Sequence, residues 1–184
     1  MWTISRRSWR SQGLILAALL IVPVFLTGLT QQDEQLFTAA KAGNVELVAQ
    51  LLKQGASVAA TDERGYMPLH LSAKAGSETV ARLLLEKGAP VDAASKERGY
   101  TPLHLAANEA VARLLLDKGA SVATTDTHQH DTALHRAAFG GWSGMAQLLV
   151  DKGASVVATN RDGVTPLHLA ARGEKARLMK GQRW

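Results

Sequence analysis

Apolar residues recur at helical spacing along most of this chain, in short blocks separated by turns that contain glycine. In the block VARLLLDKG, Val111, Leu114 and Leu115 stand at positions i, i+3 and i+4, which places them on one face of a helix. Gly119 follows at the end of the block, where helices commonly terminate. The pattern predicts a short amphipathic helix whose apolar stripe packs against a neighbouring element.

A second helix is predicted just upstream, in the segment TPLHLAA. The hydroxyl of Thr101 is able to accept a hydrogen bond from a free N–H of the first turn, and Pro102 stands at the first helical position, where no N–H is required. Leu103, Ala106 and Ala107 give this helix small side chains that let neighbouring helices approach closely. Because a pair of helices this short cannot bury its apolar face alone, it needs neighbours stacked against it.

The pair of helices is repeated along the chain. The segments MPLHLSA, TPLHLAA, TALHRAA and TPLHLAA place a histidine at one position of each unit, at spacings of 34, 31 and 33 residues. Gly-Ala pairs begin at positions 55, 88, 119 and 153. A turn, a Thr-Pro-Leu-His box, a short helix, a break and a Leu-rich helix keep the same order in each unit. This repetition predicts a solenoid in which each unit contacts its neighbours.

The recurring order of these elements resembles the ankyrin repeat, over about residues 32–181. The resemblance implies an all-α solenoid of helix-turn-helix units with β-turn or hairpin tips. The first unit lacks the Thr-Pro-Leu-His box and the last is short, as suits capping units. The expected segments are 1–30 as a signal peptide or signal anchor, 32–61 as an N-terminal capping unit, 62–95, 96–125 (three residues short) and 126–159 as repeats, and 160–184 as a short C-terminal capping repeat.

Two units are three residues shorter than the others, at the break between their helices. The loss falls at Asn108 and at Arg172, where the unit 62–95 has KAGSET. It leaves the turn, the Thr-Pro-Leu-His start and the Leu-rich helix intact. We expect a shortened first helix and a tight helix connection near Asn108, and a truncated, basic second helix in the last unit.

The first thirty residues have a different pattern. Three arginines precede an apolar run, residues 14–29, that carries no charge. This order is typical of a hydrophobic signal or anchor helix, and the positive-inside rule sends everything after it across the membrane. Cleavage and anchoring both remain open, because the run is short for a membrane span and its cleavage sites are imperfect. The segment SRRSWR also resembles a twin-arginine export signal, with an ordinary basic start as the alternative.

Charge and composition exclude several classes of function. The net charge is +5, but residues 1–30 carry +3 and the last thirteen residues carry +4, which leaves −2 on the body between them. A body of this charge gives no support to nucleic-acid binding. The absence of cysteine excludes disulfides, thiolate metal sites and cysteine nucleophiles. The segment GGWSG lacks the spacing of a serine nucleophile elbow, so we expect a protein that is not an enzyme and has no cofactor.

Histidine supplies the remaining candidates for chemistry. Two of the six histidines, His128 and His130, lie outside the repeat pattern, in the turn segment DTHQHD. If that segment is extended, its alternate side chains share a face and these two could bind one metal ion; a solvated polar turn without metal is the interpretation we favour. The resemblance assigns the other four to hydrogen bonds between neighbouring units: His70, His104, His135 and His168.

The resemblance also implies that the chain binds another protein along its concave face, built from the turn tips and the first helices. Tyr66 and Tyr100, one repeat apart and beside arginines, would form a ladder of residue types that are enriched in binding hot spots. Repeat duplication without selection for binding is the competing explanation. The expected partner-binding residues are Arg64, Tyr66, Lys74, Arg98, Tyr100, Asn108, His128, Gln129, Asp131, Phe139, Arg161 and Arg172, with Glu63, Glu97, Arg136, Asp162 and Val164 on the same face.

We therefore expect a monomeric, non-enzymatic interaction module that is exported and binds a protein partner, with no nucleic acid involved. It would be periplasmic or secreted, or anchored in the inner membrane through residues 14–29 if these are not removed. The alternatives are a secreted effector that acts on a host protein, and a metal-handling envelope protein that uses His128 and His130.

Overall fold

The computed structural model describes residues 29–181, with side chains as far as Gly173. This part of the chain is helical, with one isolated antiparallel bridge between Thr125 and Thr132. None of its helices is long and apolar enough to cross a membrane, and the expected signal or anchor segment lies outside it except for two residues. The helices are α3 (Gln31–Ala42), α4 (Val45–Lys53), α5 (Pro68–Ala75), α6 (Glu78–Glu86), α7 (Pro102–Leu105), α8 (Glu109–Asp117), α9 (Ala133–Gly140), α10 (Ser143–Asp151) and α11 (Pro166–Gly181).

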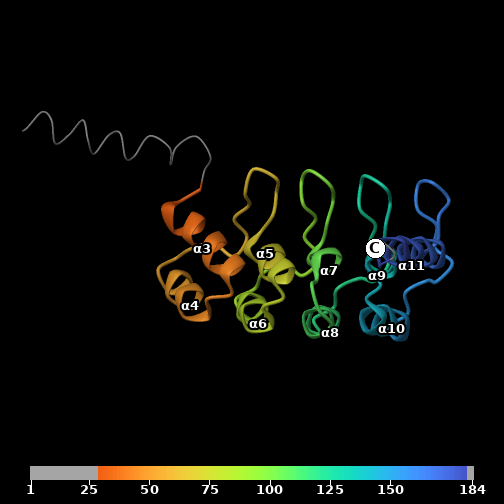
Figure 1. Ribbon diagram of the computed structural model, residues 1–184. Helices are drawn as coiled ribbons and strands as arrows, with labels where there is room; N and C mark the ends of the chain where they lie inside the picture. The colour runs from red at the N-terminus through yellow and green to blue at the C-terminus, as the bar shows by residue number, and fades with distance from the viewer. Residues whose placement is uncertain (1–28, 182–184) are drawn as a thin grey trace, which may run out of the picture.

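The helices form two rows, with a series of projecting loops along one side (Figure 1). In the first row, α3, α5, α7, α9 and α11 each pack against the next. In the second row, α4, α6, α8 and α10 do the same. The loops that precede α5, α7, α9 and α11 project away from the second row. This stack of helix pairs confirms the predicted all-α solenoid.

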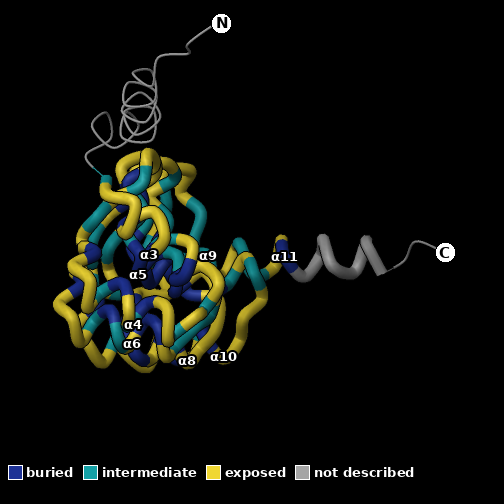
Figure 2. Tube along the Cα trace, turned by 90° about the vertical axis from the view of Figure 1, so that its left-hand side faces the viewer, coloured by how far each residue is buried: buried dark blue, intermediate teal, exposed yellow. Residues whose placement is uncertain are grey.

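Apolar side chains from both rows fill the space between them. Leu69 of α5 and Leu103 of α7 come from the first row and are almost fully buried. Val111, Leu114 and Leu115 of α8 come from the second row and are also buried, as their helical spacing predicts. Figure 2 shows the buried positions inside the stack and the exposed ones along its loops. The core is therefore shared between units, so that no unit has one of its own.

Three of the repeat histidines connect each unit to the next. Nδ1 of His104 accepts a hydrogen bond from the backbone N–H of Thr101 at 3.2 Å, and its Nε2 lies 3.0 Å from the carbonyl oxygen of Asp131 in the following unit. His70 and His135 make the equivalent bonds, each from its own unit to a backbone carbonyl of the following unit. The predicted role of these histidines is confirmed.

The three-residue loss at Asn108 has the predicted effect. It shortens α7 to four residues, against eight in α5. Oδ1 of Asn108 accepts from the N–H of Val111 at 2.9 Å and so caps α8, while its Nδ2 donates to the carbonyl of Gly76 in the preceding unit, also at 2.9 Å. One side chain thus starts the second helix and holds the tight connection in place.

The last unit differs from the prediction, because α11 runs without a break from Pro166 to Gly181. The truncated second helix expected there is not present among the described residues. Arg172 stands at the position of Asn108, and a guanidinium has no acceptor for a helix N–H, so no new helix is started. Gly173 alone does not end α11, which packs so closely on α9 that an added Cβ would lie 2.7 Å from the carbonyl oxygen of Phe139.

Candidate functional site

The projecting loops form a continuous row. These loops and the exposed sides of the first-row helices together make up one surface, which we call the tip-loop face. In each loop the backbone closes on itself, as where the N–H of Asp62 donates to the carbonyl of Tyr66 at 3.0 Å. Adjacent loops are also joined to one another. Backbone N–H groups donate to carbonyls across the gaps at 3.0, 2.9 and 2.7 Å, from Lys96 to Arg64, from Thr127 to Arg98 and from Arg161 to Gln129.

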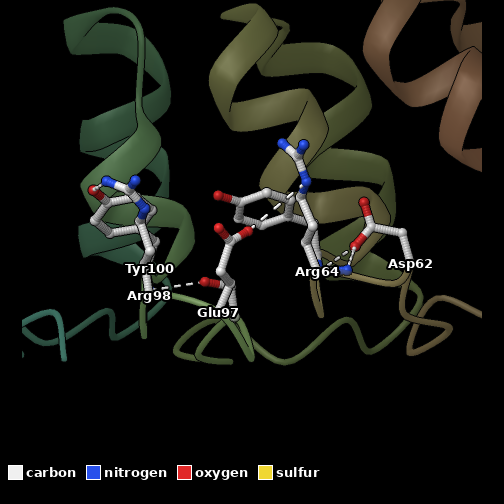
Figure 3. Close-up of polar contacts among 7 residues, drawn as sticks. Asp62, Arg64, Glu97, Arg98 and Tyr100 are labelled. Atoms are coloured by element: carbon white, nitrogen blue, oxygen red, sulfur yellow. Dashed lines mark hydrogen bonds and ion pairs between the residues drawn. The ribbon is translucent and has the colours of Figure 1, made fainter. Parts of the chain in front are cut away.

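The predicted arginines lie side by side on this face. Figure 3 shows Arg64 and Arg98 on neighbouring loops, with Glu97 between them. Nε of Arg64 lies 3.8 Å from the Glu97 carboxylate, and Nη1 of Arg98 donates to the hydroxyl of Tyr100 at 3.5 Å. These are long contacts between exposed groups, so they contribute little to stability. Both guanidinium groups remain accessible to a partner.

Tyr66 and Tyr100 lie half-buried at the base of their loops. Their rings pack on histidines of the core, with centroids 5.6 Å apart for Tyr66 and His70 and 6.1 Å apart for Tyr100 and His104. Burial raises the pKa of Tyr66 above its ordinary value, so its hydroxyl is a hydrogen-bond donor at neutral pH. Each tyrosine therefore presents a fixed ring edge and a hydroxyl to the tip-loop face.

Arg136 of α9 holds the second tyrosine in place. Its guanidinium carbon lies 4.7 Å from the centre of the Tyr100 ring, and its Nε donates to the carbonyl of His104 at 2.9 Å. A cation over an aromatic face is attractive, and the second bond fixes the orientation. Arg136 thus stabilises this part of the tip-loop face.

A pocket of about 540 Å³ opens on the same face between the last two units. It brings together four of the predicted binding residues, Gln129, Asp131, Phe139 and Arg172. Phe139 is 62% exposed, and Oε1 of Gln129 is buried without a hydrogen-bond partner among the described residues. An exposed aromatic ring beside an unpaired acceptor suits a partner side chain that offers both an apolar body and a donor.

Sequence reasoning missed one aromatic residue of this pocket. Trp142 is 43% exposed and lines the pocket beside Phe139. It occupies the N-cap position of α10, where α4 has Asn44 and α6 has Ser77. A large aromatic residue at a position that favours small polar caps was the available signal.

The remaining predicted residues are spread along the face. Lys74 lies with Arg64 and Tyr66 in a smaller pocket of about 450 Å³ between the first two units. His128 and Arg161 are exposed on the third and fourth loops. Both polar groups of the Asn108 side chain are hydrogen-bonded within the stack, as described above.

Comparison with known proteins agrees with this architecture. The family model described as "Ankyrin repeats (3 copies)" matches residues 36–126 and 124–180. The chain belongs to the ankyrin-repeat family. As an ankyrin-repeat protein it is a protein–protein interaction module, and the family favours a non-catalytic role.

Two curated relatives resemble part of this ankyrin-repeat chain. "Protein phosphatase 1 regulatory subunit 27" of Mus musculus is 42% identical over 60 residues, which cover 33% of this chain and 39% of the relative. The Homo sapiens protein of the same name is 41% identical over 58 residues, or 32% and 38% of the two chains. The chain spans about two fifths of the length of these relatives.

The third ankyrin tip loop does not have the extended backbone that the metal hypothesis required. His130 adopts a left-handed conformation with φ 57°, and Oδ1 of Asp126 accepts the N–H groups of His128 and Gln129 at 3.0 and 2.8 Å. The turn is therefore closed by its own carboxylate, so the alternative that required an extended pair of histidines does not hold, and the favoured interpretation of a polar turn agrees with this geometry. Within residues 29–173 no group of three or more His, Asp or Glu side chains is arranged to hold a metal ion.

The conformation of His130 leads to a stability prediction. The other three tip loops have a glycine with positive φ at this position: Gly65, Gly99 and Gly163. A left-handed residue with a Cβ costs about 1–2 kcal/mol, partly offset by the higher unfolded-state entropy of glycine. We expect His130→Gly to raise the free energy of unfolding by about 0.5–1 kcal/mol, measured by urea denaturation.

The converse substitution provides the control. In Gly99→Ala the new Cβ would lie 2.6 Å from Cγ2 of Thr127 at φ 66°, so stability should fall. A His130→Gly variant as stable as the original chain, or less stable, would show that the left-handed histidine is not strained.

Proposed function

We propose that this ankyrin-repeat protein binds a protein partner along its tip-loop face and carries out no chemistry itself. The observation that supports this best is the row of loops and ring edges held in place by the stack, with Tyr66 and Tyr100 on the first two loops and Phe139 toward the C-terminal end. Exposed guanidinium groups lie beside the two tyrosines. None of these side chains is fully buried in the core. A surface ordered before binding loses less entropy on association.

The residue types indicate the chemistry of the partner. Tyrosine, phenylalanine and arginine are common in binding hot spots, where aromatic side chains supply area and arginine pairs with carboxylates. Arg64, Arg98 and Arg161 stand on successive or nearby loops, and the pocket beside Phe139 adds an apolar anchor point. We infer a partner segment that carries carboxylates and at least one large apolar side chain. The printed name of the relatives, a regulatory subunit, is consistent with a role exercised through binding.

The test uses two matched pairs of arginine substitutions. Arg64→Ala with Arg98→Ala removes charge from the tip-loop face, whereas Arg82→Ala with Arg113→Ala removes the same charge from second-row helices, where each arginine pairs with a glutamate four residues earlier. In affinity capture with quantitative mass spectrometry, we expect a partner that the original chain retains to be reduced at least tenfold by the first pair and unchanged by the second. All four arginines are exposed, so the melting temperatures should be alike.

A second variant tests the tyrosines directly. Tyr66→Ala with Tyr100→Ala should reduce capture of the same partner by a similar or larger factor. Because the rings pack on His70 and His104, this variant is compared at a temperature well below its own melting point. Equal recovery of the partner from both tip-loop variants and from the control pair would place the binding site elsewhere.

We also propose that the repeat body is exported, on the basis of the basic start and the apolar run at residues 14–29. A periplasmic or secreted location, with or without an inner-membrane anchor, follows from that pattern. Cell fractionation combined with N-terminal sequencing separates the cases. Recovery in the culture medium would favour the effector alternative, and recovery in the cytoplasm with the N-terminus intact would refute export.

A further inference from the structure

An apolar groove is open at the C-terminal end of the stack. Leu167 of α11 is 76% exposed, although its counterparts in the preceding units, Leu69, Leu103 and Leu134, are at most 3% exposed. In the loop before α11, Val157 is also 76% exposed. Together with residues of α9 and α10 these side chains line a groove of about 380 Å³ that is almost entirely apolar.

The groove lies where the second helix of the last unit is missing. In the third unit, α8 packs against both α7 and α6, and its Ala112 and Leu115 are completely buried. In the last unit α11 continues as a single helix, so no second-row helix follows α10 among the described residues. The exposed face of Leu167 and Val157 is thus a binding site for one helix, left open by the course of the chain.

Residues 174–181, EKARLMKG, have the sequence of the missing helix. Counted from the Thr-Pro-Leu-His box, Ala176, Leu178 and Met179 fall at the positions of three buried residues of α8: Ala112, Leu114 and Leu115. Because α11 is continuous, however, it carries this segment away from its own groove. With a rise of 1.5 Å per residue, Leu178 lies about 12 Å along the helix axis from Ala170, which lines the groove.

We propose that residues 174–181 of a second copy of this chain fill the groove, in a two-fold dimer that exchanges these segments. Two-fold symmetry makes the exchange reciprocal, so each copy supplies a helix and receives one, and both apolar grooves are covered. The segment carries a charge of +2 and residues 31–171 carry −2, so approach is not opposed by charge. The proposal replaces the monomer expected from the sequence and is independent of the partner bound at the tip-loop face.

The first test is the oligomeric state of the full chain, measured by light scattering across a range of concentrations. The original chain should show twice the monomer mass of 19.6 kDa, or twice the processed mass if the N-terminal segment is removed. Leu167→Asp should shift it to the monomer, and because this side chain is already exposed the variant should remain folded. Leu47→Asp, at an exposed leucine of α4 at the other end of the stack, should leave the dimer unchanged. A monomeric original chain at all concentrations overturns the proposal.

The second test identifies the segment that fills the groove. The chain has no cysteine of its own, so a crosslinker joins only the cysteines that are introduced. One chain carries Val157→Cys and a second carries Leu178→Cys, and the two are mixed and treated with a short thiol-reactive crosslinker. A crosslinked heterodimer is expected, and Gln50→Cys in place of Val157→Cys should give none. If crosslinking occurs only when both cysteines are on one chain, the segment folds back within its own chain and the exchange is wrong.

The third test restores the missing turn. Replacing residues 172–174 with KAGSET, the break found in the second unit, would let the segment turn back onto its own groove. The exchange requires the continuous helix, so this variant should become monomeric while its own segment covers the groove that the partner's segment covered before. A variant that dimerises as strongly as the original chain would overturn the requirement for a continuous α11.

Discussion

Replacement of His104 by alanine is expected to lower the free energy of unfolding by about 3 kcal/mol. The ring is almost completely buried and serves both its own unit and the next. Its loss leaves the N–H of the buried Thr101 and the carbonyl of Asp131 without the bonds now made at 3.2 and 3.0 Å, and it leaves a cavity behind. The unpaired buried polar groups and the cavity each lower the free energy of unfolding, and the two losses add. His104→Ala is therefore expected to be among the larger single-residue effects.

His168 provides a matched control for this experiment. It occupies the same repeat position and makes the same local contact, in which its Nδ1 accepts from the N–H of Thr165 at 3.3 Å. It is nevertheless exposed. His168→Ala should therefore cost about 1 kcal/mol or less in urea denaturation. Similar losses in both variants would mean that the contact between units adds nothing to the local one.

Much of the fold was predictable because each repeat must bury an apolar stripe and bond to the next unit, and the residues that do so recur along the chain. The spacing of Val111, Leu114 and Leu115 identified the buried stripe, and the recurrence of histidine at one position identified the bond between units. The shortened α7 was also predictable, since the three missing residues fall between two intact patterns. In each case the prediction rests on positions that stacking itself constrains.

The continuous α11 was harder to predict, because it depends on one side chain. The third and last units have lost the same three residues, yet Asn108 can cap a new helix and Arg172 cannot. The deletion is visible in the sequence, but whether a new helix starts after it depends on which residue stands at the break. The left-handed conformation of His130 was not predicted, because it shows only when His130 is aligned with the glycines of the other three loops.

The tip-loop face was predictable in outline only. The tip-loop positions follow from the repeat, but the pocket beside Phe139 depends on how α9, α10 and α11 meet. Trp142 enters it from a capping position, and Arg136 turns toward Tyr100 instead of the solvent. Contacts of this kind join residues of different units, and no single unit of the sequence contains them.

The buried histidines also predict how the stability of the stack changes with pH. Because Nδ1 of His104 accepts a backbone N–H, the proton of the neutral ring is on Nε2, which donates to the carbonyl of the next unit. His70 has the same arrangement, with its Nδ1 3.0 Å from the N of Met67. A second proton on Nδ1 would face an N–H and break the local bond. Burial lowers the pKa of both rings in the folded state, although the bond to the carbonyl works in the opposite direction.

The direction of the pH effect follows from these pKa values. In the unfolded chain a histidine has a pKa of about 6.5, so below that pH the unfolded state binds protons that the folded state does not. Stability should therefore be constant above about pH 7 and should fall as the pH drops from about 6.5 toward the lowered pKa values of His70 and His104. Each of the two contributes a slope of at most about 1.4 kcal/mol per pH unit in that interval.

Urea denaturation at pH 7.5, 6.5 and 5.5 measures this slope in the original chain and in two variants. His104→Gln keeps a polar side chain but cannot take up a proton. The dependence of the unfolding free energy on pH below 6.5 should therefore become less steep, by up to about 1.4 kcal/mol per pH unit. This variant is also expected to be less stable than the original chain at pH 7.5. His168→Ala removes an exposed histidine and should leave the slope unchanged. If stability is the same at pH 7.5 and 5.5, or if His168→Ala reduces the slope as much as His104→Gln does, the buried rings are not what makes the stack sensitive to acid.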